Sequence, residues 1–221
     1  MDISNIVTAV IINYQTPDLI RHAIASFRKF YPNVQLILID NGSRDESVKI
    51  LTDIQSTQSA TTKLVLNKTN IHHGPAMHQA INLCSSDLVL FLDSDCEVLG
   101  GGFIEAMIEL IEQDKQHYAV GKTEFLNERG FLVKPNQKSI RYIRPICMLV
   151  RKTLYNALPP FQLHGAPCLA NMKEAAERNF GLIEFDIHKF IFHKGRGTAS
   201  KFGYGLGIRG KVNYLLNKLN L

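Results

Sequence analysis

The chain has 221 residues, of which 45% are hydrophobic and 20% charged, a balance typical of an ordinary soluble globular protein. Its formal net charge of +5 suits an anionic substrate, a nucleotide or an anionic lipid headgroup as partner. Because no run of Lys and Arg is interleaved with aromatic residues, the charge pattern argues against a nucleic acid partner.

Strands and helices are predicted to alternate over the first hundred residues. Apolar runs of strand length predict strands at 6–13, 34–39, 63–66 and 88–92. Helical apolar spacing predicts a helix after each strand, starting at Thr16-Pro17, at a capping box of Ser43 and Glu46, at Gly74-Pro75, and after 100–102. This alternation predicts an α/β fold with a parallel sheet, right-handed crossovers and helices on both faces.

The second half predicts shorter elements of mixed type. We expect strands at 118–122, 123–125, 130–134, 146–151, 182–185 and 189–192, and helical segments at 152–158 and 169–179. Residues 207–221 carry apolar side chains at helical spacing with cations among them, which predicts an amphipathic tail helix. There is no Ser- or Pro-rich linker and no repeat, so the sequence predicts a single domain over 1–221.

The cysteines and the apolar segments both favour a cytoplasmic protein. Four cysteines lie far apart without a Cys-x-x-Cys pair, which fits reduced thiols better than a disulfide framework or a zinc site. No segment reaches the roughly 18 apolar residues that a membrane span needs, and the first apolar run is only of strand length.

Polar residues gather where three of the predicted strands end. They are Asn13 and Tyr14, Asp40 and Asn41, and Asp93 and Asp95. In an open α/β sheet the ligand crevice lies beyond the carboxyl ends of the strands, so these side chains are expected at one edge. Two neighbouring carboxylates repel unless a cation joins them, and hard oxygen ligands favour Mg²⁺ or Mn²⁺. The pattern predicts a site for a metal and a diphosphate, although Asp93 and Asp95 also fit a simple acidic turn.

Three segments of the first hundred residues resemble a known family. They are VTAVIINYQTPDLI (7–20), LILIDNGSRDES (36–47) and NIHHGPAMHQAINLCSSDLVLFLDSDCEV (70–98), and they are similar to family-2 glycosyltransferases with the GT-A fold. IRPICMLVRKTLYNAL (143–158) and FIFHKGRGTAS (190–200) resemble later parts of that family. The resemblance implies a nucleotide-binding half at 1–100, an acceptor-side half at 101–206 and a tail helix at 207–221.

The resemblance also implies residues that hold a nucleotide-diphosphate sugar. Tyr14 would stack on the base and Asp40 would accept a hydrogen bond from it, flanked by Asn13 and Asn41; alternatively Tyr14 packs and Asp40 caps a turn. A basic side chain often precedes the third helix in related sequences, and His72 or His73 occupies that region. Gly74 could present backbone amides of this helix to an anion, or simply start the helix.

A metal ion and its ligands are implied in the same way. Asp93, Ser94 and Asp95 match the Asp-x-Asp motif of the family, with Asp95 as the more direct ligand of Mn²⁺ or Mg²⁺. His193 would complete the coordination, and Arg196 lies in a loop that would fold over the diphosphate. Alternatively, His193 is a structural residue at the end of a strand and Arg196 is solvated.

The general base is where the chain departs from the family. An acidic pair is expected just before the helix that precedes the His strand, but residues 163–168 read Leu-His-Gly-Ala-Pro-Cys. Three explanations stand: His164 is the base, Glu174 or Asp186 reaches the acceptor, or the protein binds nucleotide sugar without efficient transfer. With the family's usual base, transfer would invert the anomeric centre.

The acceptor implied by the resemblance is a glycan or a lipid-linked sugar. The tail helix could lie on the inner membrane face near a lipid-linked acceptor, or pack on its own domain or on a twin subunit. A haloacid-dehalogenase phosphatase is disfavoured because its Asp-x-Asp normally follows the first strand. A sugar nucleotidyltransferase is disfavoured because its Gly-rich loop is replaced here by NYQTPD.

Overall fold

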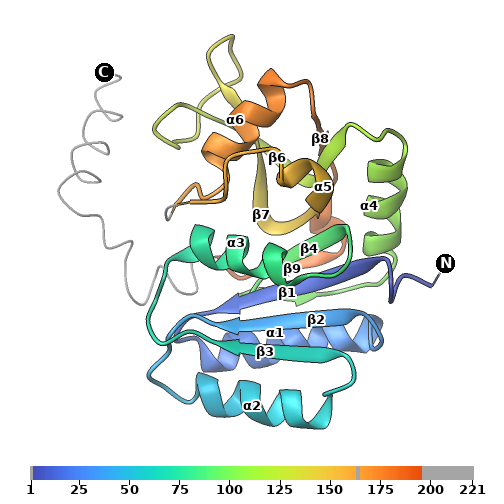
Figure 1. Cartoon of the computed structure of the whole chain (residues 1–221), viewed down its shortest axis with the longest axis vertical. Helices are drawn as coiled ribbons and strands as arrows, with labels where there is room; N and C mark the ends of the chain where they lie inside the picture. Colours follow the sequence, from blue (N-terminus) through green and yellow to red (C-terminus); the bar gives the residue numbers. More distant parts are fainter. Residues whose placement is uncertain (1, 163–164, 196–221) are drawn as a thin grey trace.

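A computed structural model describes residues 2–162 and 165–195 of the chain (Figure 1). Its central sheet has seven strands in the order β3-β2-β1-β4-β7-β6-β8, and β5 and β9 form a second, two-stranded sheet. Neighbouring strands are parallel from β3 to β4 and between β6 and β8, whereas β7 is antiparallel to both β4 and β6. The predicted α/β fold with a mostly parallel sheet is confirmed.

The first half of the chain alternates strand and helix as predicted. Its elements are β1 (Val7–Asn13), α1 (Pro17–Phe30), β2 (Gln35–Asp40), α2 (Ser47–Thr57), β3 (Thr62–Leu66), α3 (His73–Leu83) and β4 (Leu88–Asp93). β1 is buried along its whole length and β4 along all but its last residue, as expected of strands between two layers of helices. α1 starts at Pro17, whose fixed φ suits the first helical position and whose missing N–H costs nothing there.

The start of α2 differs from the prediction. The capping box of Ser43 and Glu46 does not form, because the helix begins at Ser47 and Glu46 caps it without a side-chain hydrogen bond. The Ser43 amide instead donates to Asp40 Oδ1 at 2.8 Å, and Ser43 Oγ accepts from the Gln15 amide at 2.8 Å. The buried carboxylate of Asp40 needs hydrogen-bond donors, and the Ser43 amide is one of them.

The second half differs more from the prediction. Its elements are β5 (Cys96–Val98), α4 (Phe103–Glu112), β6 (His117–Leu126), β7 (Ile140–Arg151), α5 (Lys152–Tyr155), α6 (Leu169–Glu177), β8 (Gly181–Glu184), the 3₁₀ helix η1 (Ile187–Lys189) and β9 (Ile191–His193). The strands predicted at 118–122 and 123–125 are one strand with an irregularity after Gly121, and β7 begins at Ile140 rather than at 146. The strand predicted at 130–134 is reduced to a single bridge, between Leu126 and Leu132.

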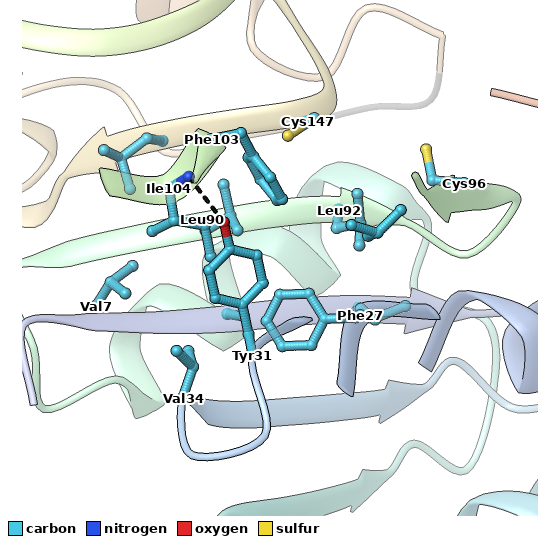
Figure 2. Close-up of a cluster of buried hydrophobic side chains, with 14 of the residues drawn as sticks. Val7, Phe27, Tyr31, Val34, Leu90, Leu92, Cys96, Phe103, Ile104 and Cys147 are labelled. Atoms are coloured by element: carbon cyan, nitrogen blue, oxygen red, sulfur yellow. Dashed lines mark hydrogen bonds between the residues drawn. The ribbon is translucent and has the colours of Figure 1, made fainter. Parts of the chain in front are cut away.

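The sheet separates two apolar layers. α1, α2 and α4 pack on one face, and α3 and α6 pack on the other. Figure 2 shows the centre of the first layer, where the rings of Tyr31 and Phe103 meet edge to face with centroids 5.2 Å apart. The Tyr31 hydroxyl accepts a hydrogen bond from the Ile104 amide at 3.3 Å and donates one to Glu105 at 3.1 Å, so this buried phenol ties the end of α1 to the start of α4.

No helix in the described part of the chain is long and apolar enough to cross a membrane. The four cysteines are buried and form no disulfide. The predicted tail helix at 207–221 lies outside the described residues, as do His164 and Arg196.

Candidate functional site

The carboxyl ends of three neighbouring strands meet at one edge of the sheet. In the strand register Asn13 lies beside Asp40 of β2, and Ile12 lies beside Asp93 of β4. The chain leaves β1 toward β2 on one side while β4 lies on the other, so this edge is a topological switch point. A cavity of about 550 Å³ opens there, and its walls include Asn13, Tyr14, Asn41, Asp93, Asp95 and His193.

Asp93, Asp95 and His193 form a cluster that could hold a metal ion. Each offers one ligand atom, and these atoms lie within 4.8 Å of one another. His193 is brought there by the pairing of β9 with β5, in which it lies beside Cys96, one residue after Asp95. The His193 Nε2 atom is 3.1 Å from Asp95 Oδ1, and the Lys194 amide donates to the Asp95 carbonyl at 3.0 Å. The structure thus unites residues nearly a hundred positions apart.

The electrostatics of this cluster are those of a site short of positive charge. Burial and the neighbouring Asp95 raise the pKa of Asp93 to about 7, against the opposing effects of His193 and Arg144. The hydrogen bond to Asp95 raises the pKa of His193, although burial of the ring opposes this. Two carboxylates this close keep a proton unless a cation takes its place, and the oxygen and imidazole donors suit Mn²⁺ or Mg²⁺.

Of the two histidines at the start of α3, the structure places His73 at the site. Its Nε2 atom is 3.7 Å from Asp93 Oδ1 and it lines the cavity. Burial lowers the pKa of His73 to about 4, so its ring is neutral at physiological pH. It would therefore contact a ligand as a polar, uncharged group. His72 does not line the cavity; it precedes α3 with a φ of 71°, and its carbonyl accepts from the Asn41 side chain at 3.2 Å.

Gly74 is required by packing in this structure. A Cβ at this position would lie 2.5 Å from the backbone carbon and oxygen of Gln162, a contact that neither backbone can relieve. Gly74 does not line the cavity itself, but it lies against the start of the segment 162–167, whose last residues do.

Replacing Gly74 by alanine is therefore expected to lower the free energy of unfolding by about 1–3 kcal/mol, the usual cost of overpacking. Urea denaturation followed by circular dichroism measures this. Gly100→Ala is the matched control, because its Cβ would find only Phe190 at 3.9 Å, an ordinary contact. If the two variants were equally stable, packing would not explain Gly74.

The polar residues at the ends of β1 and β2 form a buried network. The Asn13 side chain donates to Asp40 Oδ2 at 3.0 Å and accepts from the Thr16 hydroxyl at 2.7 Å. Asp40 is only 1% exposed and does not line the cavity. Its carboxylate accepts hydrogen bonds from the Asn13 side chain and the Ser43 amide. Asn13, Tyr14 and Asn41 are the residues of this group that reach the cavity wall.

Two of the three base candidates from the sequence, Glu174 and Asp186, lie away from the cavity, and the third, His164, is outside the described residues. Glu174 lies on α6, where it binds Arg178 at 2.7 Å, and Asp186 is exposed at the start of η1, where it accepts from the His188 amide at 3.3 Å. Neither lines the cavity. Ser94 does, and it is nearly buried between the two aspartates.

Sequence reasoning missed the wall of the cavity formed by β6 and β7. Glu124 and Arg144 lie there with their side chains 3.1 Å apart, next to the ring of Tyr142. No motif marks these residues, because they are single half-buried charged residues in stretches of β6 and β7 whose burial does not alternate regularly. The pairing of β7 with β4 is the signal that would reveal them, because it places β7 and its neighbour β6 beside the metal cluster.

Comparison with known proteins finds relatives by sequence and by structure. A family model described as glycosyl transferase family 2 matches residues 8–176. An uncharacterized glycosyltransferase of Haemophilus influenzae is 30% identical over 124 residues, covering 54% of this chain and 48% of that protein. An undecaprenyl-phosphate 4-deoxy-4-formamido-L-arabinose transferase of Pseudomonas fluorescens is 28% identical over 81 residues, covering 37% and 24%. The chain thus spans half or less of the length of these curated relatives.

Two solved structures share the fold at low sequence identity. A mannosyltransferase from Pyrobaculum calidifontis, in complex with GDP-Man and Mn²⁺, superposes with a TM-score of 0.65 at 12% identity over 81% of this chain and 54% of that one. GalNAc-T7 with UDP, GalNAc and Mn²⁺ superposes with a TM-score of 0.69 at 12% identity over 97% of this chain and 48% of that one. At this level of identity the likeness establishes the fold.

Proposed function

The chain belongs to glycosyl transferase family 2, and from this we propose that its cavity binds a nucleotide-diphosphate sugar with Mn²⁺ or Mg²⁺ and transfers the sugar to an acceptor hydroxyl. The observation that carries the proposal is the cluster of Asp93, Asp95 and His193 at the switch point of the sheet. Carboxylates alone would repel a diphosphate, so a site that gathers them beside a cavity of this size needs a cation to receive one.

The residues of the chain divide the work at this site. Asp95 and His193 would hold the metal, with Asp93 beside them; when bound, the metal would offset the negative charge that develops on the departing diphosphate. Tyr14 lies at the end of the cavity formed by β1 and would stack on the nucleotide base, with Asn13 and Asn41 next to it. Asp40, held by Asn13, would support this end from below.

The acceptor belongs to the proposal as well. The Pseudomonas fluorescens relative is named for transfer to undecaprenyl phosphate, and a lipid-linked acceptor of this kind fits a protein that acts at the inner membrane face. Cell-surface glycan or glycolipid synthesis would then be the process served. Contact with the membrane, or with a second copy of the chain, would come from residues 207–221.

A second function is favoured by one observation on the sequence. The acidic pair expected within 163–168 is absent, which would leave a module that binds nucleotide sugar without efficient transfer. The two functions share the metal site and differ only in turnover.

Turnover and metal removal test the proposal together. The protein is expected to release nucleoside diphosphate from at least one of UDP-glucose, UDP-N-acetylglucosamine, GDP-mannose and dTDP-glucose in the presence of Mn²⁺. EDTA should reduce release to background, and excess Mn²⁺ should restore it. Metal-dependent binding without turnover, with glycan and polyprenyl phosphate acceptors included, would favour the binding module. No binding of any of these donors would reject both functions.

A further inference from the structure

The wall of the cavity contributed by β6 and β7 carries a carboxylate that the metal cluster does not use. In the antiparallel register Glu124 lies directly opposite Tyr142, so both side chains leave the same face of the sheet. Arg144, two residues further along β7, donates to Glu124 at 3.1 Å, and all three residues line the cavity. This wall stands beside the metal cluster and not under the nucleotide end at β1 and β2.

Glu124 is held in place without being enclosed. Its Oε1 atom accepts a hydrogen bond from Arg144 Nη1 at 3.1 Å, and its side chain is 21% exposed. In the part of the chain that the structure describes, Oε2 has no hydrogen-bond partner, so one oxygen is fixed and the other remains able to accept a proton. A guanidinium that donates to one carboxylate oxygen restricts the orientation of the carboxylate and leaves the second oxygen directed elsewhere.

The surroundings of Glu124 are those of a place for an acceptor. Leu126, Leu132, Pro145 and Ile146, which lie on β6 and β7 or on the segment between them, also line the cavity, and Leu132 is 66% exposed. Apolar side chains beside a carboxylate leave fewer competing polar groups at the cavity wall that a hydroxyl would approach. A charged residue that served only stability would more often sit on the open surface, as Glu128 does with Lys173 at 2.9 Å.

The choice of base narrows once the cavity is known. Among the described residues three carboxylates line it, namely Asp93, Asp95 and Glu124. The first two belong to the metal cluster, where a bound cation would occupy their lone pairs and make them poor bases. Glu124 is the remaining candidate for the base, and it lies on β6, a strand that no sequence motif marks.

We propose that Glu124 is the general base of sugar transfer and that Arg144 is its positioning residue, an inference that rests on the proposed function. Oε2 of Glu124 takes the proton of the acceptor hydroxyl as the acceptor oxygen forms its bond to the anomeric carbon. The bond from that carbon to the diphosphate oxygen breaks in the same step, and its electron pair leaves with the nucleoside diphosphate. Charge and atoms balance, with the proton on Glu124 released later to solvent. The role fills the place left by the missing acidic pair.

Glu124→Gln is the decisive variant, because glutamine keeps the shape and the acceptor oxygen for Arg144 but cannot take a proton. The probe is the donor that the wild type turns over among UDP-glucose, UDP-N-acetylglucosamine, GDP-mannose and dTDP-glucose, with Mn²⁺ and with water as acceptor. Nucleoside diphosphate release should fall by roughly 10²-fold or more, while calorimetry shows donor binding within about twofold of wild type. Glu128→Gln is the matched control and should keep wild-type release, since Glu128 is exposed, ion-paired and outside the cavity.

Azide rescue separates a base from a residue that only maintains structure. Azide attacks the anomeric carbon without losing a proton, so Glu124→Ala with azide should regain release and form a glycosyl azide, which mass spectrometry detects. A merely structural role predicts no such rescue. Wild-type release by Glu124→Gln, or loss of release on Glu174→Gln instead, would overturn the role of Glu124 alone. Absence of donor turnover by the wild type, with glycan and polyprenyl phosphate acceptors included, would reject sugar transfer, and the role of Glu124 with it.

Discussion

Replacing Asp95 by alanine is expected to weaken Mn²⁺-dependent binding of nucleoside diphosphate by at least about 100-fold. Even outer-shell partners of metal ligands typically cost 10–100-fold in affinity when removed, and Asp95 is proposed as a direct ligand. Asp95 also accepts from His193 at 3.1 Å, so its loss removes one ligand and releases the orientation of a second. Titration calorimetry with Mn²⁺ and UDP, and in parallel with Mn²⁺ and GDP, measures the effect.

The controls for this experiment distinguish a metal ligand from a general change of charge. Asp53→Ala removes one carboxylate from the exposed side of α2 and should leave both titrations at wild-type affinity. His193→Ala should weaken the same binding by about tenfold or more, because imidazole is the third ligand that the cluster offers. If Asp95→Ala and His193→Ala bound Mn²⁺ and nucleotide as the wild type does, both residues would be excluded from the metal shell.

The metal cluster could be anticipated from the sequence because its signals are local. Asp93 and Asp95 follow an apolar run of strand length, and strand ends in such a sheet meet at one edge. His193 was recognised by resemblance to the family, yet its approach to Asp95 depends on the pairing of β9 with β5. β5 has only three residues and no pattern that predicts a strand. Its partner is β9, which lies nearly a hundred residues later in the chain.

Residues whose partners are distant in sequence could not be assigned by pattern. Ser43 has the spacing of a capping box, but its amide donates to the buried carboxylate of Asp40 instead. Gly74 reads as a helix start, and only the structure shows the Gln162 backbone against its Cα. Glu124 reads as an ordinary strand residue, and its place in the cavity follows from pairings of β6 with β7 and of β7 with β4. Local sequence carries periodicity, whereas non-local pairing decides which faces meet.

Truncating Phe103 to alanine is expected to lower the free energy of unfolding by about 3–5 kcal/mol. Its ring is fully buried and meets the ring of Tyr31 edge to face (Figure 2), with centroids 5.2 Å apart. The centroid of the Phe190 ring lies 6.1 Å away. Alanine would lose the transfer free energy of the ring and leave a cavity that α1, α4 and the sheet cannot close together. Urea denaturation measures this difference in the free energy of unfolding, provided that the m-value is the same for the variant and the wild type.

Leu99→Ala is the matched control for Phe103→Ala, because it truncates an apolar side chain four residues away that is 55% exposed. The cost of Leu99→Ala in free energy of unfolding should stay within about 0.5 kcal/mol, the usual range for surface substitutions.

The effect of Phe103→Ala should reach the site through Phe190. This residue directly precedes β9, and its carbonyl accepts from the Leu99 amide at 2.7 Å. Loss of the Phe103 ring should therefore loosen the strand that carries His193 and weaken Mn²⁺ binding at temperatures where the variant is still folded. A cost below about 1 kcal/mol for Phe103→Ala would show that this layer repacks freely and does not position the metal ligands.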